Sequence, residues 1–256
     1  MVQSQLIATI EKAALFAWPP VETAFFRGWL LRGGGGHSRR LNSAATLDFE
    51  GGDGDGASLA RAVAHVERWY GERGAPPCFH LCDRVRPQGL DPYLEARGYD
   101  RLTDTNVMLA AIDPHMVCRH AVELEGRATA LAMNALCDPL WSSTVRAARA
   151  AVISRIARPI VIAVVTIDGA PRAGGLCVVD GELAGIFSVR SDPRFRRRGL
   201  ARSVMARLAV WAHGMGARRF YLQVEDDNAP ALGLYRSLGF ATVYRYHYRQ
   251  LGEGRA

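Results

Sequence analysis

The sequence is poor in lysine, poor in cysteine and without a long apolar run, and each shortage excludes a class of protein. Lys12 is the only lysine, so arginine supplies almost all of the positive charge in a chain whose formal net charge is +7. Five scattered cysteines, an odd number, do not form the framework of a disulfide-rich secreted protein. The apolar run from Pro159 to Val165 is far shorter than the roughly 20 residues that a membrane helix needs.

The N-terminus also lacks the basic segment and the apolar segment of a secretory signal peptide. We therefore expect a cytoplasmic protein that does not associate with a membrane. The 256 residues, of which 49% are hydrophobic and 22% charged, have an ordinary globular composition. This length allows one large domain or two small ones.

The excess of arginine favours a polyanionic ligand, either a nucleic acid or a phosphorylated cofactor. A bias of the coding sequence toward arginine explains the overall charge equally well. It does not explain one local cluster, which consists of Arg194, Arg196, Arg197 and Arg198.

This arginine cluster lies between a predicted strand and a predicted helix. Residues 183–190 are rich in β-forming side chains, and the turn-forming Ser191, Asp192 and Pro193 follow them. After Gly199, apolar residues recur in steps of three and four, the pattern of one helix face. They are Leu200, Val204, Leu208, Trp211 and Met215.

A helix that starts at this point is suited to bind phosphate. Its first turn has unpaired backbone N–H groups and the positive end of the helix dipole. Gly199 and Ala201 have little side-chain bulk, so a pyrophosphate can approach the backbone closely. A run of arginines alone is usually a solvated surface. A strand, small residues and a helix start in combination indicate a phosphate-binding site more specifically.

A second pattern follows the first along the chain. Residues 220–224 predict a buried strand, and residues 229–238 predict a helix that ends at Gly239. The next segment alternates like a strand. It has Tyr244, Tyr246 and Tyr248 on one face and Arg245, His247 and Arg249 on the other.

Together the two patterns resemble the GCN5-related N-acetyltransferases (GNAT), over roughly residues 122–250. The first signature of these enzymes, Arg/Gln-x-x-Gly-x-Gly/Ala, reads here Arg196-Arg197-Arg198-Gly199-Leu200-Ala201. The second signature matches at Leu222, Val224, Asn228, Ala231, Leu234, Tyr235, Gly239 and Phe240. Two motifs in the right order and spacing are hard to obtain by chance.

The resemblance implies an α/β (α+β) GNAT fold, a twisted mixed sheet flanked by helices. It also implies transfer of an acetyl group from acetyl-CoA to a primary amine, on a small molecule, a peptide or a protein, by direct attack in a ternary complex. The amides of Arg196, Arg197, Arg198, Gly199, Leu200 and Ala201 would hold the CoA pyrophosphate. Phe187, Ser188 and Val189 would lie beside the thioester, and no metal is expected.

The resemblance further assigns roles to single residues. It makes Tyr235 a cofactor contact and the catalytic proton donor to the departing thiolate, with plain packing as the alternative. Asn228 would contact the cofactor, cap the helix, or do both. A backbone N–H near Val189 would stabilise the oxyanion.

The general base stays open at this point. Asp192, Glu225, Asp226 and His247 are all conceivable, and each is also explained as a cap, a loop residue or a solvated side chain. A base that acts through a water molecule would leave no motif.

The N-terminal half shows a faint internal repeat at an offset of 141 residues. Leu59-Ala60-Arg61 aligns with Leu200-Ala201-Arg202, Phe79-x-Leu81 with Phe220-x-Leu222, and Gly98-Tyr99 with Gly239-Phe240. We therefore predict two tandem copies, in domains 1–113 and 119–256, with residues 112–119 as the linker. An unrelated N-terminal extension is the alternative.

This first copy lacks the residues of the cofactor site. The positions that match Arg196 to Gly199 are Asp55, Gly56, Ala57 and Ser58. Leu94 occupies the position that matches Tyr235, and Pro87 occupies the position that matches Asn228. The acidic loop 50–55 would repel a pyrophosphate. We expect a degenerate domain that packs on the active one and helps to shape the acceptor site.

Two further segments of the N-terminal half have patterns that predict strands. Residues 25–47 predict a hairpin around the glycines 33–36, and Arg39, Arg40 and Asn42 either face the acceptor or are solvated. Cys78, His80 and Cys82 alternate on one strand face, which favours a buried strand over a metal site because more ligands would be needed.

Two other functions compete with the acetyltransferase. A non-catalytic acyl-CoA-binding module would bind the cofactor without turnover, and a nucleic-acid-binding protein would use the arginine charge. The intact second signature argues against both. The expected partners are therefore acetyl-CoA and an amine acceptor, without nucleic acid, for a chain that is a monomer or a homodimer.

Overall fold

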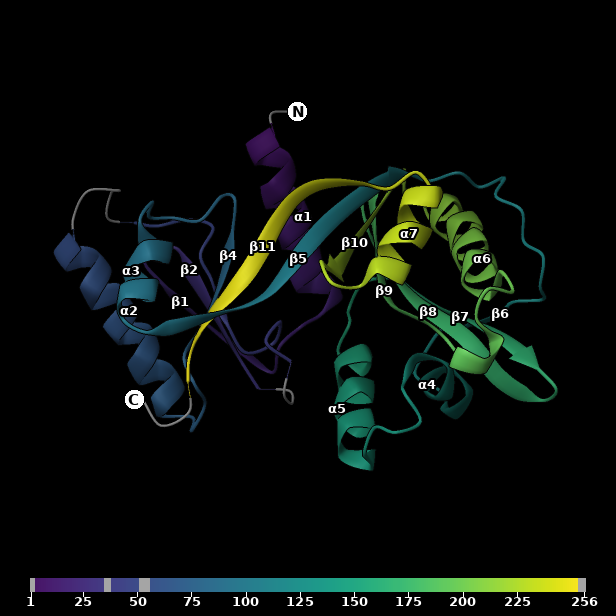
Figure 1. Ribbon diagram of the computed structural model, residues 1–256, viewed down its shortest axis with the longest axis horizontal. Helices are drawn as coiled ribbons and strands as arrows, with labels where there is room; N and C mark the ends of the chain where they lie inside the picture. The colour runs from purple at the N-terminus through teal and green to yellow at the C-terminus, as the bar shows by residue number, and fades with distance from the viewer. Residues whose placement is uncertain (1–2, 35–37, 51–55, 253–256) are drawn as a thin grey trace.

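The computed structural model describes residues 3–34, 38–50 and 56–252, which form one mixed sheet of eleven strands flanked by helices (Figure 1). The order of the strands across the sheet is β1-β2-β3-β4-β11-β5-β10-β9-β8-β7-β6. The strands are β1 (Glu22–Phe26), β2 (Trp29–Gly33), β3 (Ala44–Ala45), β4 (Cys78–Cys82), β5 (Tyr99–Ala111), β6 (Glu123–Glu125), β7 (Ile160–Ile167), β8 (Ala170–Asp180), β9 (Leu183–Ser191), β10 (Arg219–Glu225) and β11 (Ala241–Leu251).

Seven α-helices and one 3₁₀ turn, η1 (Pro193–Phe195), accompany these strands in the described residues. The helices are α1 (Gln3–Ala17), α2 (Gly56–Gly71), α3 (Leu90–Ala96), α4 (Ala130–Leu136), α5 (Ser143–Ser154), α6 (Leu200–Gly214) and α7 (Ala229–Ser237). None of these helices is long and apolar enough to cross a membrane.

The predicted repeat is present in the fold. Adding 141 to the bounds of β4 gives 219–223, within β10, and adding 141 to those of β5 gives 240–252, which brackets β11. The order β1-β2-β3-β4-β11 is repeated as β7-β8-β9-β10-β5. Strand directions agree as well, because β3–β4 and β9–β10 are the parallel pairs of the two halves. The two copies are thus related about the centre of the sheet.

At that centre, each half inserts its last strand into the other half. Strand β5 pairs with β10 and β11, and β11 pairs with β4 and β5, all antiparallel. In Figure 1 these two strands are the long ribbons that cross the middle of the molecule. The boundary that we predicted in the sequence therefore separates two segments that share one sheet. Residues 112–122, between β5 and β6, form no helix or strand.

The helices cover the sheet as the sequence predicts. Leu200, Val204 and Leu208 of α6 are buried against the sheet, where they belong to a core that also includes Phe220 and Phe240. A second core, under α2 and α3, consists of buried apolar residues of these helices and of the strands that they cover. A third core runs below α1, α4 and α5 and includes residues of both halves.

One prediction about the N-terminal half is wrong. The hairpin turns at Arg27 and Gly28, between the paired residues Phe26 and Trp29, and Gly33 instead ends β2. Both turn residues have positive φ, 48° and 84°, as a two-residue hairpin turn of right-handed twist requires. Gly28 also lies against the backbone of Asp48, where a side chain would have a contact of 3.1 Å. Residues 35–37 of the predicted glycine turn lie outside the described residues.

Candidate active site

Strands β9 and β10 run side by side and then separate. They are paired in parallel from Leu183 and Arg219 to Ile186 and Leu222, and the pairing stops there although both strands continue. The three strand residues predicted to lie beside the thioester, Phe187, Ser188 and Val189, follow directly on β9. Their backbone thus borders an opening in the sheet.

A bulge in β9 marks this opening. The register of β9 on β8 shifts between the pairs Leu176–Phe187 and Gly174–Arg190. Ser188 has a φ of 55°, a left-handed conformation that is rare for a residue with a side chain. A bulge leaves the extra residue outside the regular ladder. The backbone groups near Ser188 are therefore the ones available for another partner.

The basic loop lies between β9 and α6. Asp192 orders its start, because its carboxylate accepts bonds from the Arg194 backbone and from the guanidinium groups of Arg194 and Arg172, at 3.0 to 3.2 Å. Hydrogen bonds from Arg194, ahead of those from Arg172, hold the pKa of Asp192 far below its usual range. Asp192 is thus a buried structural carboxylate, and it is a poor candidate for the general base.

The end of the same loop forms the start of α6. Gly199 is the N-cap, with a φ of 80° and no side-chain cap, so the first N–H groups of the helix keep their bonding capacity. Apart from its chain neighbours, no heavy atom of the described residues lies within 4 Å of the position that a Cβ on Gly199 would take. Arg196, Arg197 and Arg198 are exposed around this open space. A polyanion has access to both the helix start and the guanidinium groups.

Helix α7 carries the two other predicted residues. Asn228 is the N-cap, and its side chain accepts a bond of 3.3 Å from the Ala231 backbone, so the capping alternative holds. Tyr235 is buried beside Phe240, with ring centroids 5.6 Å apart. Burial raises the pKa of Tyr235 to about 12, so its hydroxyl keeps the proton at neutral pH.

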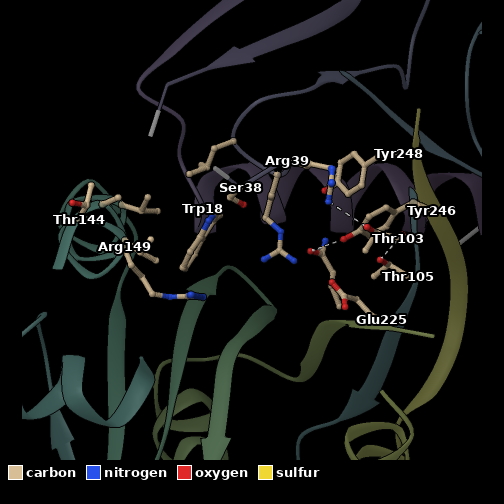
Figure 2. Close-up of a pocket in the computed structure, with 16 residues that line it drawn as sticks. Trp18, Ser38, Arg39, Thr103, Thr105, Thr144, Arg149, Glu225, Tyr246 and Tyr248 are labelled. Carbon is tan, nitrogen blue, oxygen red and sulfur yellow. Dashed lines mark hydrogen bonds between the residues drawn. The ribbon is translucent and has the colours of Figure 1, made fainter. Parts of the chain in front are cut away.

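A pocket of about 440 Å³ adjoins the opening between β9 and β10. Its residues come from both halves of the chain (Figure 2). They are Trp18, Ser38, Arg39, Arg40, Leu41, Thr103, Thr105, Thr144, Val145, Ala148, Arg149, Val152, Gln223, Glu225, Tyr246 and Tyr248. In Figure 2, Trp18 and Arg149 lie on one side, and Thr105, Tyr246 and Glu225 lie on the other.

Glu225 is the single carboxylate in the lining of this pocket among the described residues. The other base candidates have partners elsewhere. Asp226 accepts a 2.8 Å bond from Asn106 and lies 3.5 Å from Arg245. His247 contacts Asp91 at 3.2 Å, and burial lowers the pKa of His247. Of the four candidates, only Glu225 lines this pocket.

The family model of the "Probable histone acetyltransferase Rv0428c C-terminal" matches residues 4–249, which is nearly the whole chain. The chain belongs to this family. It is thereby a member of the GNAT superfamily and an acetyl-CoA-dependent N-acetyltransferase, as the sequence predicts.

Individual relatives agree with this assignment. The "Uncharacterized N-acetyltransferase YobR" of Bacillus subtilis is 27% identical over 251 residues, which cover 95% of this chain and 98% of YobR. A GCN5-related N-acetyltransferase from Kribbella flavida has a TM-score of 0.70 at 16% identity, over 99% of this chain and 96% of the other. A "Tandem GNAT protein from the clavulanic acid biosynthesis pathway" has a TM-score of 0.67 at 15% identity, over 94% and 87%. The fold is thus a GNAT fold that also occurs in a tandem form.

Several pocket residues of this member of the Rv0428c C-terminal family lie outside both sequence signatures. Trp18 directly follows α1 of the first half, Arg149 is on α5 of the second half, and Thr103 and Thr105 are on the exchanged strand β5. Sequence reasoning could not find them because only the fold brings them together. Arg39 and Arg40 do line the pocket, whereas Asn42 bonds the backbone of Gly34 and Ser38.

The matching site of the N-terminal half has a different form. Strand β3, the counterpart of β9, has only two residues, and β4 pairs with it at Ala44 and Ala45. Leu94, which replaces Tyr235, is fully buried in α3. The acidic residues 51–55 lie outside the described residues. Cys78, His80 and Cys82 are all buried on β4, and burial raises the pKa of both thiols to about 12.

Proposed function

We propose that the chain transfers the acetyl group of acetyl-CoA to a primary amine by direct attack in a ternary complex. The observation that carries the proposal is the opening between β9 and β10. It has a bulge at Ser188, and it lies between a basic helix start and a pocket that contains Glu225. A separate acyl-enzyme nucleophile is not needed when both substrates can meet at one opening.

The residues around the opening fit the cofactor. The uncapped start of α6, with Arg196 to Ala201 around the open space at Gly199, would hold the pyrophosphate. The unpaired edge of β9 at Phe187, Ser188 and Val189 would bind the pantetheine arm, and Asn228 would contact the cofactor from α7. When bound, acetyl-CoA supplies an activated acyl carbon and a thiolate leaving group.

Three groups of the protein would then act on the reaction: a base for the amine proton, an acid for the thiolate, and a backbone N–H for the developing oxyanion. Glu225, directly or through one water molecule, takes a proton from the amine as the N–C bond forms. A backbone N–H near Val189 donates to the oxyanion. As the C–S bond breaks, the Tyr235 hydroxyl would donate its proton to the thiolate sulfur. The tyrosinate would then regain a proton from solvent, and Glu225 would release to solvent the proton that it took from the amine. The products are an amide and a free thiol.

Thermal unfolding with and without acetyl-CoA tests the cofactor site. A ligand at about 100 times its Kd adds roughly 2.7 kcal/mol, which shifts Tm by a few degrees in a chain of this size. We expect this shift in the native protein and its loss in Gly199→Glu. Gly181→Glu is the matched control, because Gly181 also has a positive φ, 59°, and open space around it.

Release of free thiol from acetyl-CoA in the presence of a panel of primary amines tests the reaction. Thiol release that depends on the amine supports the transferase. A Tm shift without thiol release for any amine would instead support the non-catalytic acyl-CoA-binding module. No Tm shift at saturating acetyl-CoA would refute the proposal.

A further inference from the structure

The pocket beside the opening contains three arginines and one carboxylate. Arg39, Arg40 and Arg149 all line it, together with Glu225. Within residues 3–34, 38–50 and 56–252, none of the three arginines forms an ion pair with a carboxylate. A charge in a partly buried position is costly unless it has a partner. Arg39 donates to the uncharged side chains of Gln250 and Thr103, and an anionic ligand would supply the opposite charge.

Arg149 is the most confined of the three. Its guanidinium lies between the rings of Trp18 and Trp141, 5.2 and 5.0 Å from their centroids. One terminal nitrogen donates a 2.8 Å bond to the Ser188 hydroxyl, while the buried Nε has no hydrogen-bond partner in the described residues. Burial, with a further contribution from the charge of Arg40, lowers the pKa of Arg149. An arginine nevertheless stays charged at neutral pH.

Arg40 approaches the same place from the other half of the chain. Its guanidinium lies 5.6 Å from the centroid of the Phe187 ring, and Phe187 stacks on Trp18 at 5.7 Å. Phe187 and Ser188 are the residues proposed to lie beside the thioester. The two cations therefore both lie at the residues of β9 that we propose for the thioester, Arg149 at Ser188 and Arg40 at Phe187.

We propose that the acceptor is a small amine that carries a carboxylate or a phosphate close to its nitrogen, and that Arg149 and Arg40 bind this anionic group. This inference rests on the proposed acetyl transfer, since it names the acceptor of that reaction. Charge-assisted bonds from a guanidinium to either oxyanion are strong and directional. The pocket volume of about 440 Å³ is within the range of small-molecule sites. A lysine-rich peptide tail would meet repulsion from the two cations.

Matched pairs of amines test the proposal at saturating acetyl-CoA. The pairs are alanine and alaninamide, glycine and glycinamide, and O-phosphoethanolamine and ethanolamine, with rates compared per concentration of unprotonated amine. We expect kcat/KM for the anionic member of at least one pair to exceed that of its neutral partner by about 10- to 100-fold. The pair with the larger ratio distinguishes a carboxylate from a phosphate.

Variants of Arg149 connect the preference to the pocket. We expect Arg149→Gln to abolish the preference mainly through a higher KM, since the lost contact is made in the ground state as well. Arg149→Lys should restore part of it. Arg146→Gln is the control, because Arg146 lies one turn earlier on α5, bonds Asn134 and does not line the pocket. It should keep the native ratio.

If the enzyme acetylates neither member of any pair, calorimetry tests whether the pocket binds an anionic group. N-acetylalanine and N-acetylalaninamide are titrated into the native protein with and without CoA. Binding of the acid alone, lost in Arg149→Gln, supports the anion site, and equal or absent binding of both overturns it. Equal turnover of charged and neutral amines also overturns it. A failure of acetyl-CoA to bind would refute the proposed function, and the acid–amide comparison without CoA would still judge the anion site.

Discussion

At the scale of single residues, the surroundings of a side chain decide its chemistry more than its type does. Asp192, Asp226 and Glu225 are all acidic and all close to the two signatures in the sequence. Asp192 is held by two arginines and Asp226 by Asn106, whereas Glu225 faces the pocket. The same reasoning separates Arg149, which has no carboxylate partner among the described residues, from Arg172, which pairs with Asp192.

Replacement of Glu225 should therefore affect the reaction more than the fold. We expect Glu225→Gln to lower kcat/KM by about 100-fold, the lower end of what a general base contributes. Because Glu225 is exposed, the Tm of the Glu225→Gln protein should stay within about 2 °C of the native value. Steady-state thiol release with the best acceptor and a melting curve measure the two effects. Asp227→Asn is the control, because Asp227 is also an exposed carboxylate and lies two residues after Glu225, in the turn that follows β10. Equal activity of both variants would remove Glu225 from the mechanism.

Tyr235 gives a prediction about pH. Because burial raises its pKa from 10.0 to about 12, the folded state keeps a proton between those values that the unfolded chain has lost. The free energy of unfolding therefore falls as the pH rises above 10, and Tyr235 adds no pH dependence below that. We expect Tyr235→Phe to show a shallower loss of Tm above pH 10 than the native protein. At pH 8 its kcat should be about 10- to 100-fold lower. An unchanged kcat would leave Tyr235 with a packing role only.

At the scale of elements, the sequence predicts the regular parts and misses the irregular ones. The strand 183–190, the strand 220–224 and the helix that starts after Gly199 all agree with the structure, since each follows from a regular period and a clear end signal. The bulge at Ser188 has no such signal because it depends on the pairing of β9 with β8. The hairpin was misplaced because four glycines are a stronger turn signal than Arg27-Gly28.

Near the start of the opening, Gly185 of β9 lies close to the side chains of Tyr221 on β10 and Phe187 on β9. A Cβ on Gly185 would lie 2.5 Å from the Tyr221 hydroxyl and 2.6 Å from the Phe187 ring, both buried. We expect Gly185→Ala to destabilise the protein by about 1–3 kcal/mol, as overpacking does, and to raise the KM for acetyl-CoA because β9 must shift. Denaturant unfolding and initial rates measure these changes.

The control for this change is Gly233→Ala. Gly233 lies inside α7, and beyond that helix's own backbone and its chain neighbours no heavy atom of the described residues lies within 4 Å of an added Cβ. Alanine there should leave stability unchanged or raise it by about 0.4–1 kcal/mol. A Gly185→Ala protein as stable as this control would show that Tyr221 and Phe187 can move aside without cost.

At the scale of the whole molecule, the pocket beside the opening has residues from both halves, and the two halves exchange their last strands. The C-terminal half contains both signatures, yet Trp18, Arg40, Thr103 and Thr105 come from the other half. Repeat detection in the sequence suggested a packed second copy. The exchange itself was not predictable, because β5 and β11 have the same pattern whether they pair within their own half or across halves.

This exchange predicts the behaviour of the separated halves. Residues 119–256 alone lack β5, so β10 and β11 lose their common partner, and the surface that Val107 and Met108 bury becomes exposed. We expect this fragment to aggregate when it is expressed alone. Co-expression with residues 1–113 should yield a soluble one-to-one complex, detected by size-exclusion chromatography, in which acetyl-CoA raises Tm. A soluble monomer of 119–256 with a cooperative melting transition and the same acetyl-CoA shift would show instead that β5 is dispensable. The N-terminal half would then contribute only to the pocket beside the opening, and amine turnover by the fragment would measure that contribution directly.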